Sequence, residues 1–101
     1  MLDVVRRTGG SIADVSDDEV VDSIRLLAAT EGIFGETAGG VTLGVLRKLL
    51  KEGRLDPDAE TVIINSGDGL KTLDAVAGAV DVPEPIRPTL EAFTERYPAV
   101  G

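Results

Sequence analysis

Cysteine, histidine and tryptophan are absent from this chain of 101 residues. Without cysteine the chain can form no disulfide and carry no thiolate chemistry. Without histidine it has neither the commonest general base nor the commonest metal ligand, so a metal site would need carboxylates alone. We therefore predict no metal site and no complete set of catalytic residues within this chain.

Positive charge is scarce as well, because 18 acidic residues face 10 basic ones and the net charge is −8. An acidic surface repels the phosphates of nucleic acids and of anionic lipids, so neither nucleic acid nor a membrane is an expected partner. No signal peptide and no apolar run of membrane-spanning length is visible, which predicts a cytoplasmic location. The length predicts one domain, and a hydrophobic content of 43% with three aromatic residues predicts an aliphatic core.

Two helices are indicated in the first half of the chain. Ser16 and Glu19 have the spacing of a capping box, the periodic apolar residues follow, and Gly32 is expected to end the helix. The second helix is predicted over Thr37 to Glu52, with Gly53 as its stop. Its first half contains several small residues, which fits close packing against a neighbouring element or, alternatively, a bound ring lying against this turn.

Two strands are predicted, from Ser11 to Val15 and from Glu60 to Asn65. A further helix is predicted over Leu70 to Ala77, and residues 79–101 form a proline-rich linker and a last helix from about Thr89 to Arg96. Strands separated by helices favour an α/β fold in which a small parallel sheet is flanked by helices. Because two strands leave sheet edges unpaired, we expect a part of something larger or a chain that associates with its own copies.

The loop Asn65-Ser66-Gly67-Asp68-Gly69 is the main candidate for chemistry. It follows the second predicted strand, at the end where open parallel sheets bind ligands, and its two glycines allow a close approach of the backbone. The helix that follows offers free N–H groups to an anion. The pattern also fits an ordinary strand–turn–helix corner, and the residues alone leave both interpretations open.

Two ordered segments resemble the threonine synthase family. Residues 65–72, Asn-Ser-Gly-Asp-Gly-Leu-Lys-Thr, resemble a late motif of these enzymes, and residues 31–42, which include Glu-Gly-Ile and Ala-Gly-Gly, resemble an upstream one. The resemblance covers roughly residues 9–76 and implies that residues 1–101 are a single α/β fragment from the C-terminal part of a fold type II, pyridoxal-phosphate-dependent enzyme. That family converts O-phosphohomoserine and water to threonine and phosphate.

The resemblance also implies a cofactor role for four residues. Ser66 occupies the position of a hydroxyl that faces the pyridine nitrogen of pyridoxal phosphate, with Gly67 beside it. Glu36 and Ala38 are expected to lie near the cofactor ring. Ser66 stands where the family usually has threonine, which keeps the hydroxyl, and Thr37 stands where proline is usual.

Important parts of the family's site are missing from this chain. The lysine that forms the Schiff base and the phosphate-binding loop come from segments N-terminal to the matching one. We therefore expect no pyridoxal phosphate on this chain alone and no activity alone, with pairing to an N-terminal part as the first expectation. The alternative is a stand-alone interaction or regulatory module that self-associates without catalysis.

Overall fold

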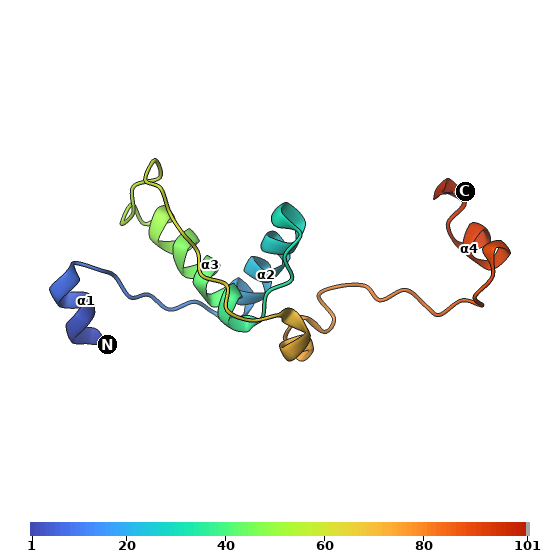
Figure 1. The fold of residues 1–101 in the computed structure, drawn as a ribbon, viewed down its shortest axis with the longest axis horizontal. Helices are drawn as coiled ribbons and strands as arrows, with labels where there is room; N and C mark the ends of the chain where they lie inside the picture. The colour runs from blue at the N-terminus through green and yellow to red at the C-terminus, as the bar shows by residue number, and fades with distance from the viewer. Residues whose placement is uncertain (101) are drawn as a thin grey trace.

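The computed structural model describes residues 1–100 and contains four α-helices and two short 3₁₀ helices within that range (Figure 1). Their bounds, in chain order, are α1 Leu2–Thr8, α2 Asp17–Glu31, α3 Thr37–Lys51, η1 Gly69–Val76, α4 Leu90–Arg96 and η2 Pro98–Val100. Helices α2 and α3 form a hairpin and make the most extensive packing between elements, and η1 packs against α3. Helix α4 packs against η2.

Helix α2 begins and ends where the sequence predicts. The Ser16 hydroxyl accepts a hydrogen bond from the Glu19 backbone N–H (3.2 Å), and the Glu19 carboxylate accepts one from the Ser16 backbone N–H (2.7 Å). Gly32 adopts a φ of 67°, a left-handed conformation that glycine takes readily. The capping box and the glycine stop are therefore both confirmed.

The hydrophobic core lies between α2 and α3 and is small. Val20, Ile24 and Leu49 are its buried apolar side chains, and the Ser23 hydroxyl lies among them fully buried. The Ser23 oxygen accepts a hydrogen bond from the Arg47 guanidinium on α3 (3.4 Å), so its burial is compensated.

Glycines on α3 allow the two helices to approach closely. A Cβ at Gly40 would lie 2.8 Å from Ile24 Cγ1 and from the Val20 carbonyl oxygen, and one at Gly44 would lie 3.3 Å from Ser23 Oγ, all on α2. Both separations are shorter than ordinary carbon contacts. Close packing therefore accounts for these two glycines.

The predicted parallel sheet is wrong, because residues 1–100 contain no strand. Residues 11–15 and 60–65 are extended but unpaired, and Val62 and Ile64 remain 82% and 76% exposed. Within residues 1–100 the only bridges are isolated residue pairs, Gly35 with Asp68 and Ala77 with Val80. An extended segment becomes a strand only when a neighbour accepts and donates its backbone hydrogen bonds, and the described part of the chain supplies no such neighbour.

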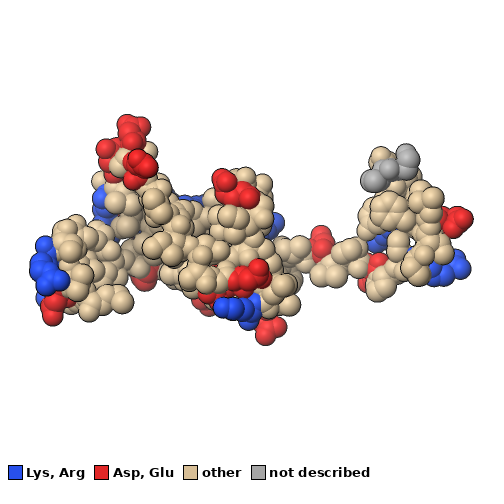
Figure 2. All heavy atoms as spheres, viewed as in Figure 1, with Lys and Arg blue, Asp and Glu red and all other residues tan. Residues whose placement is uncertain are grey.

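The chain after η1 extends away from the hairpin (Figure 1). The helix predicted over Leu70 to Ala77 is a 3₁₀ helix with a kink at Thr72, and α4 follows an extended proline-containing linker. Figure 2 shows the thin linker between the hairpin and the lobe that holds α4. The radius of gyration is 18.6 Å, whereas a compact domain of this length has about 13 Å.

Candidate functional site

The loop at residues 65–69 lies against the connection between α2 and α3, so the two motif segments are neighbours in space. The Glu36 backbone N–H donates to the Gly67 carbonyl (3.1 Å), and the Gly69 N–H donates to the Phe34 carbonyl (2.8 Å). These bonds form the antiparallel bridge of Gly35 with Asp68. Residues more than thirty positions apart are thereby held in one short backbone clasp.

Side-chain hydrogen bonds extend this clasp at both of its ends. The Thr37 backbone N–H, the first of α3, donates to the Thr72 hydroxyl on η1 (3.2 Å). The Asp68 carboxylate accepts from the Leu70 N–H (2.8 Å) and so caps η1. The loop is thus fixed between the start of α3 and the start of η1.

The four residues implicated by the resemblance lie in or beside the clasp. The half-buried Glu36 places its carboxylate in direct contact with Gly67, which has no side chain to occupy that space. Ser66 is exposed at the tip of the extended segment, and Ala38 is exposed in the first turn of α3. The structure therefore joins Glu36 to Gly67, while Ser66 and Ala38 flank that contact and face solvent.

Three further residues build the site: Asn65, which the sequence placed in the candidate loop without a role of its own, and Phe34 and Thr72, which were not predicted as site residues. The Asn65 amide lies over Gly35 and Gly39, and the Phe34 ring covers Gly69. Thr72 supplies the hydroxyl that accepts from the start of α3. No local pattern indicates these contacts, because each joins residues at least 26 positions apart in the sequence.

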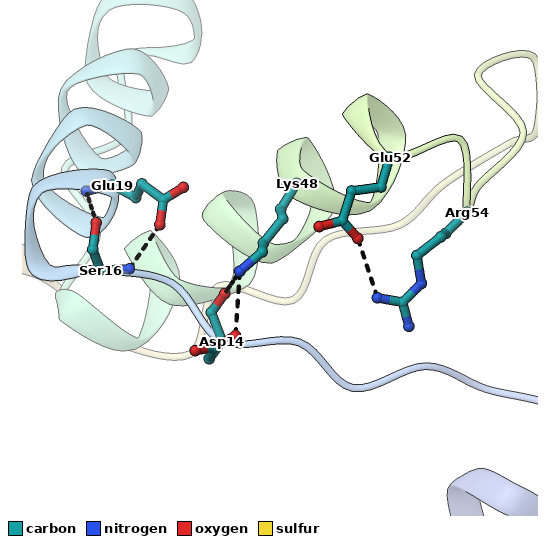
Figure 3. A network of polar contacts seen from close by, with 6 residues as sticks. All are labelled: Asp14, Ser16, Glu19, Lys48, Glu52 and Arg54. Carbon is teal, nitrogen blue, oxygen red and sulfur yellow. Dashed lines mark hydrogen bonds and ion pairs between the residues drawn. The ribbon is translucent and has the colours of Figure 1, made fainter.

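The charged residues near the hairpin serve its structure. The Lys48 ammonium donates to the carbonyl oxygen (2.7 Å) and the carboxylate (3.2 Å) of Asp14, and that hydrogen bond lowers the Asp14 pKa (Figure 3). The Arg54 guanidinium pairs with Glu52 at 3.2 Å. Lys48 is thus engaged in an ion pair, and Lys71 is exposed beside the clasp.

Within residues 1–100, neither a metal-binding cluster nor the hollow between α2 and α3 adds to the clasp. No group of three histidine, cysteine, aspartate or glutamate residues in that range could hold a metal ion. A polar hollow of about 480 Å³ lies between α2 and α3, but its lining includes none of the four residues named above. None of the helices described within residues 1–100 has the length and apolar character needed to span a membrane.

Comparison with known proteins extends the motif resemblance. A family model described as "Pyridoxal-phosphate dependent enzyme" matches residues 1–67, about two thirds of the chain. The chain is also 43% identical over 82 residues, or 81% of its length, to the threonine synthase of Methanocaldococcus jannaschii. The predicted resemblance to part of a threonine synthase is confirmed.

Other similar proteins bear the same name. The chain is 31% identical over 94 residues to the threonine synthase of Methanosarcina acetivorans and 29% identical over 90 residues to that of Halalkalibacterium halodurans. These alignments cover 93% and 89% of the chain. The chain spans between a fifth and a quarter of the length of these relatives, namely 20%, 23% and 25%.

Proposed function

Because the chain belongs to the pyridoxal-phosphate dependent enzyme family, we propose that it is a C-terminal part of a threonine synthase and supplies one wall of the cofactor site. The observation that carries this proposal is the clasp that joins the two motif segments. A fold type II domain would provide the rest of the wall. The substrate of the complete enzyme would then be O-phosphohomoserine, and the products threonine and phosphate.

The residues of the clasp fit one edge of a pyridoxal phosphate site. The exposed Ser66 hydroxyl can donate a hydrogen bond to a pyridine nitrogen, and Gly67 leaves space beside it. When bound, the cofactor supplies an electron sink for bonds at the amino-acid substrate. A neutral hydroxyl does not force protonation of the ring nitrogen, whereas a carboxylate at that position would.

Glu36 and Ala38 would complete this edge in different ways. The Glu36 carboxylate contacts Gly67 and so orients the loop, while its backbone N–H holds the Gly67 carbonyl. Ala38 exposes only a methyl group in the first turn of α3, which leaves room for a flat ring. We propose that both residues shape the space next to the ring.

None of the three lysines of this chain is suited to form the Schiff base, so the remaining part of the enzyme would have to supply that lysine. Lys48 is paired with Asp14, and Lys51 lies near the end of α3 with Glu52 beside it. Lys71 is exposed and corresponds to the lysine of the late motif, whose family role is not the Schiff base. We therefore propose that the chain neither binds pyridoxal phosphate nor turns over substrate alone.

A complementation experiment tests this function. The chain is mixed with the Methanocaldococcus jannaschii threonine synthase from which the 82 matching residues have been deleted. We expect the mixture, with pyridoxal phosphate, to release phosphate from O-phosphohomoserine, and neither piece to do so alone. Ser66→Ala should lower the rate and Ser66→Thr should preserve it. Failure of the pieces to bind, or turnover by the chain alone, would contradict the proposal.

A second candidate is a self-associating module without catalysis. The uncovered apolar side chains favour it, because Val82 is 86% exposed and Val62 82% exposed. An apolar hollow of about 520 Å³ also lies between α2 and the η1 region, lined in part by Phe34 and Val80. Apolar surface of this kind marks interaction sites. The solution mass of the chain at several concentrations distinguishes this candidate.

A further inference from the structure

Asn65 occupies a notch that two glycines form at the start of α3. A Cβ at Gly35 would lie 2.8 Å from the Asn65 amide oxygen, and a Cβ at Gly39 would lie closer still. The amide carbon is 3.5 Å from the first of these positions and 3.4 Å from the second. The Asn65 side chain therefore fits this place only because both positions carry no side chain.

The contact of Asn65 lies next to Ser66, the residue with the main role in the proposed site. Asn65 is an exposed residue whose amide contacts Gly35 and Gly39, and it directly precedes Ser66, so this contact restrains the backbone from which the Ser66 hydroxyl projects. The clasp fixes the other side of the loop through the Gly67 carbonyl and the Gly69 N–H. Ser66 is thus held between a seated side chain and a pair of backbone hydrogen bonds.

We propose that Asn65 is a positioning residue, whose amide in the notch of Gly35 and Gly39 sets the direction of the Ser66 hydroxyl. The proposal rests on the cofactor role proposed above for Ser66. It assigns Asn65 no contact with the cofactor or the substrate. Asn65 would act on Ser66 through the loop backbone. We therefore expect a substitution in the notch to change hydrogen exchange in the loop without lowering the stability of α3.

Gly39→Ala is the discriminating variant. Alanine favours a helix over glycine, so α3 should keep or gain stability. The new methyl group must displace the Asn65 amide, which is the free end of a short side chain and can rotate away. We expect an unchanged or raised unfolding midpoint, together with faster hydrogen exchange at the Gly69 and Glu36 amides, by roughly fivefold to tenfold.

Asn65→Ala should accelerate exchange at the same two amides, because it empties the notch. In the Gly39→Ala, Asn65→Ala double variant, the Gly69 and Glu36 amides should exchange no faster than in either single variant, because both substitutions remove the same interaction. Val41→Ala is the matched control, because Val41 is exposed on the same helix and not in the notch. It should leave exchange in the loop unchanged.

The cofactor spectrum tests the link to Ser66. In the complemented enzyme, Asn65→Ala and Ser66→Ala should shift the absorption of bound pyridoxal phosphate in the same direction, and the two shifts should not add. Unchanged exchange at Gly69 and Glu36 in both Asn65→Ala and Gly39→Ala would overturn the positioning role. A spectrum insensitive to Ser66→Ala, with exchange altered as expected, would instead overturn the cofactor role of Ser66.

Discussion

At the scale of single residues, the capping box of Ser16 and Glu19 predicts how the stability of α2 responds to pH. The backbone N–H of Ser16, assisted by its hydroxyl, lowers the pKa of the Glu19 carboxyl below its ordinary value of 4.5. A group whose pKa is lower in the folded state stabilises that state above its unfolded pKa, and the contribution is lost as pH falls through the folded value. Glu19→Gln should therefore make helicity less sensitive to acid below about pH 4.5.

Circular dichroism during an acid titration measures this effect. Asp22→Asn is a suitable control, because Asp22 lies on the same helix outside the capping box. Ser16→Ala removes the acceptor for the Glu19 N–H and should cost about 1 kcal/mol of folding free energy at neutral pH. An acid response of Glu19→Gln identical to that of the parent chain would show that the capping box carries no linkage.

At the residue scale, sequence and structure agree where chemistry is local. The capping box needs only residues three positions apart, so its two hydrogen bonds could be predicted. The contact of the Asn65 amide with Gly39 and Gly35 spans 26 and 30 positions of the sequence and depends on the Asn65 rotamer. No local sequence pattern therefore reveals it. The Thr72 contact with Thr37 depends on the same long-range docking.

At the scale of elements, Gly40 controls how closely α2 and α3 pack. A methyl group there would meet the Val20 backbone carbonyl and the Ile24 side chain, both at 2.8 Å. Overpacking costs about 1–3 kcal/mol, which exceeds the gain of about 1 kcal/mol in helix propensity. Gly40→Ala should therefore lower the thermal unfolding midpoint, in contrast to Gly39→Ala on the preceding residue. A midpoint at or above that of the parent chain would contradict this packing.

Whether a predicted element is present depends on where its backbone hydrogen bonds come from. Helices α2 and α3 satisfy their own backbones and present one apolar face to each other, so periodicity and caps suffice to find them. The strand predicted over 60–65 requires a neighbouring strand, which residues 1–100 do not provide. The β-branched residues of this segment favour an extended backbone, and the segment is extended. Pairing additionally requires a neighbouring strand, which the local sequence cannot specify.

The whole molecule has more apolar surface than its own core can cover. Among the side chains that the structure describes, three apolar ones are buried, whereas Val62, Ile64 and Val82 are each at least 76% exposed. The longest dimension is 63 Å, and α4 lies far from the hairpin (Figure 1). Such a shape suits a chain that a larger protein body covers, in keeping with alignments that cover only 20% and 25% of the relatives' length.

The uncovered surface predicts the behaviour of the isolated chain. We expect its weight-average mass in sedimentation to rise with concentration, because association removes apolar surface from water. Ile64→Ser should weaken this association, whereas Thr61→Ser, an exposed polar change nearby, should leave it unaltered. The truncated threonine synthase should compete with self-association, because both would cover the same side chains. A mass that stays monomeric at every concentration would contradict the prediction and remove the self-associating module as a candidate.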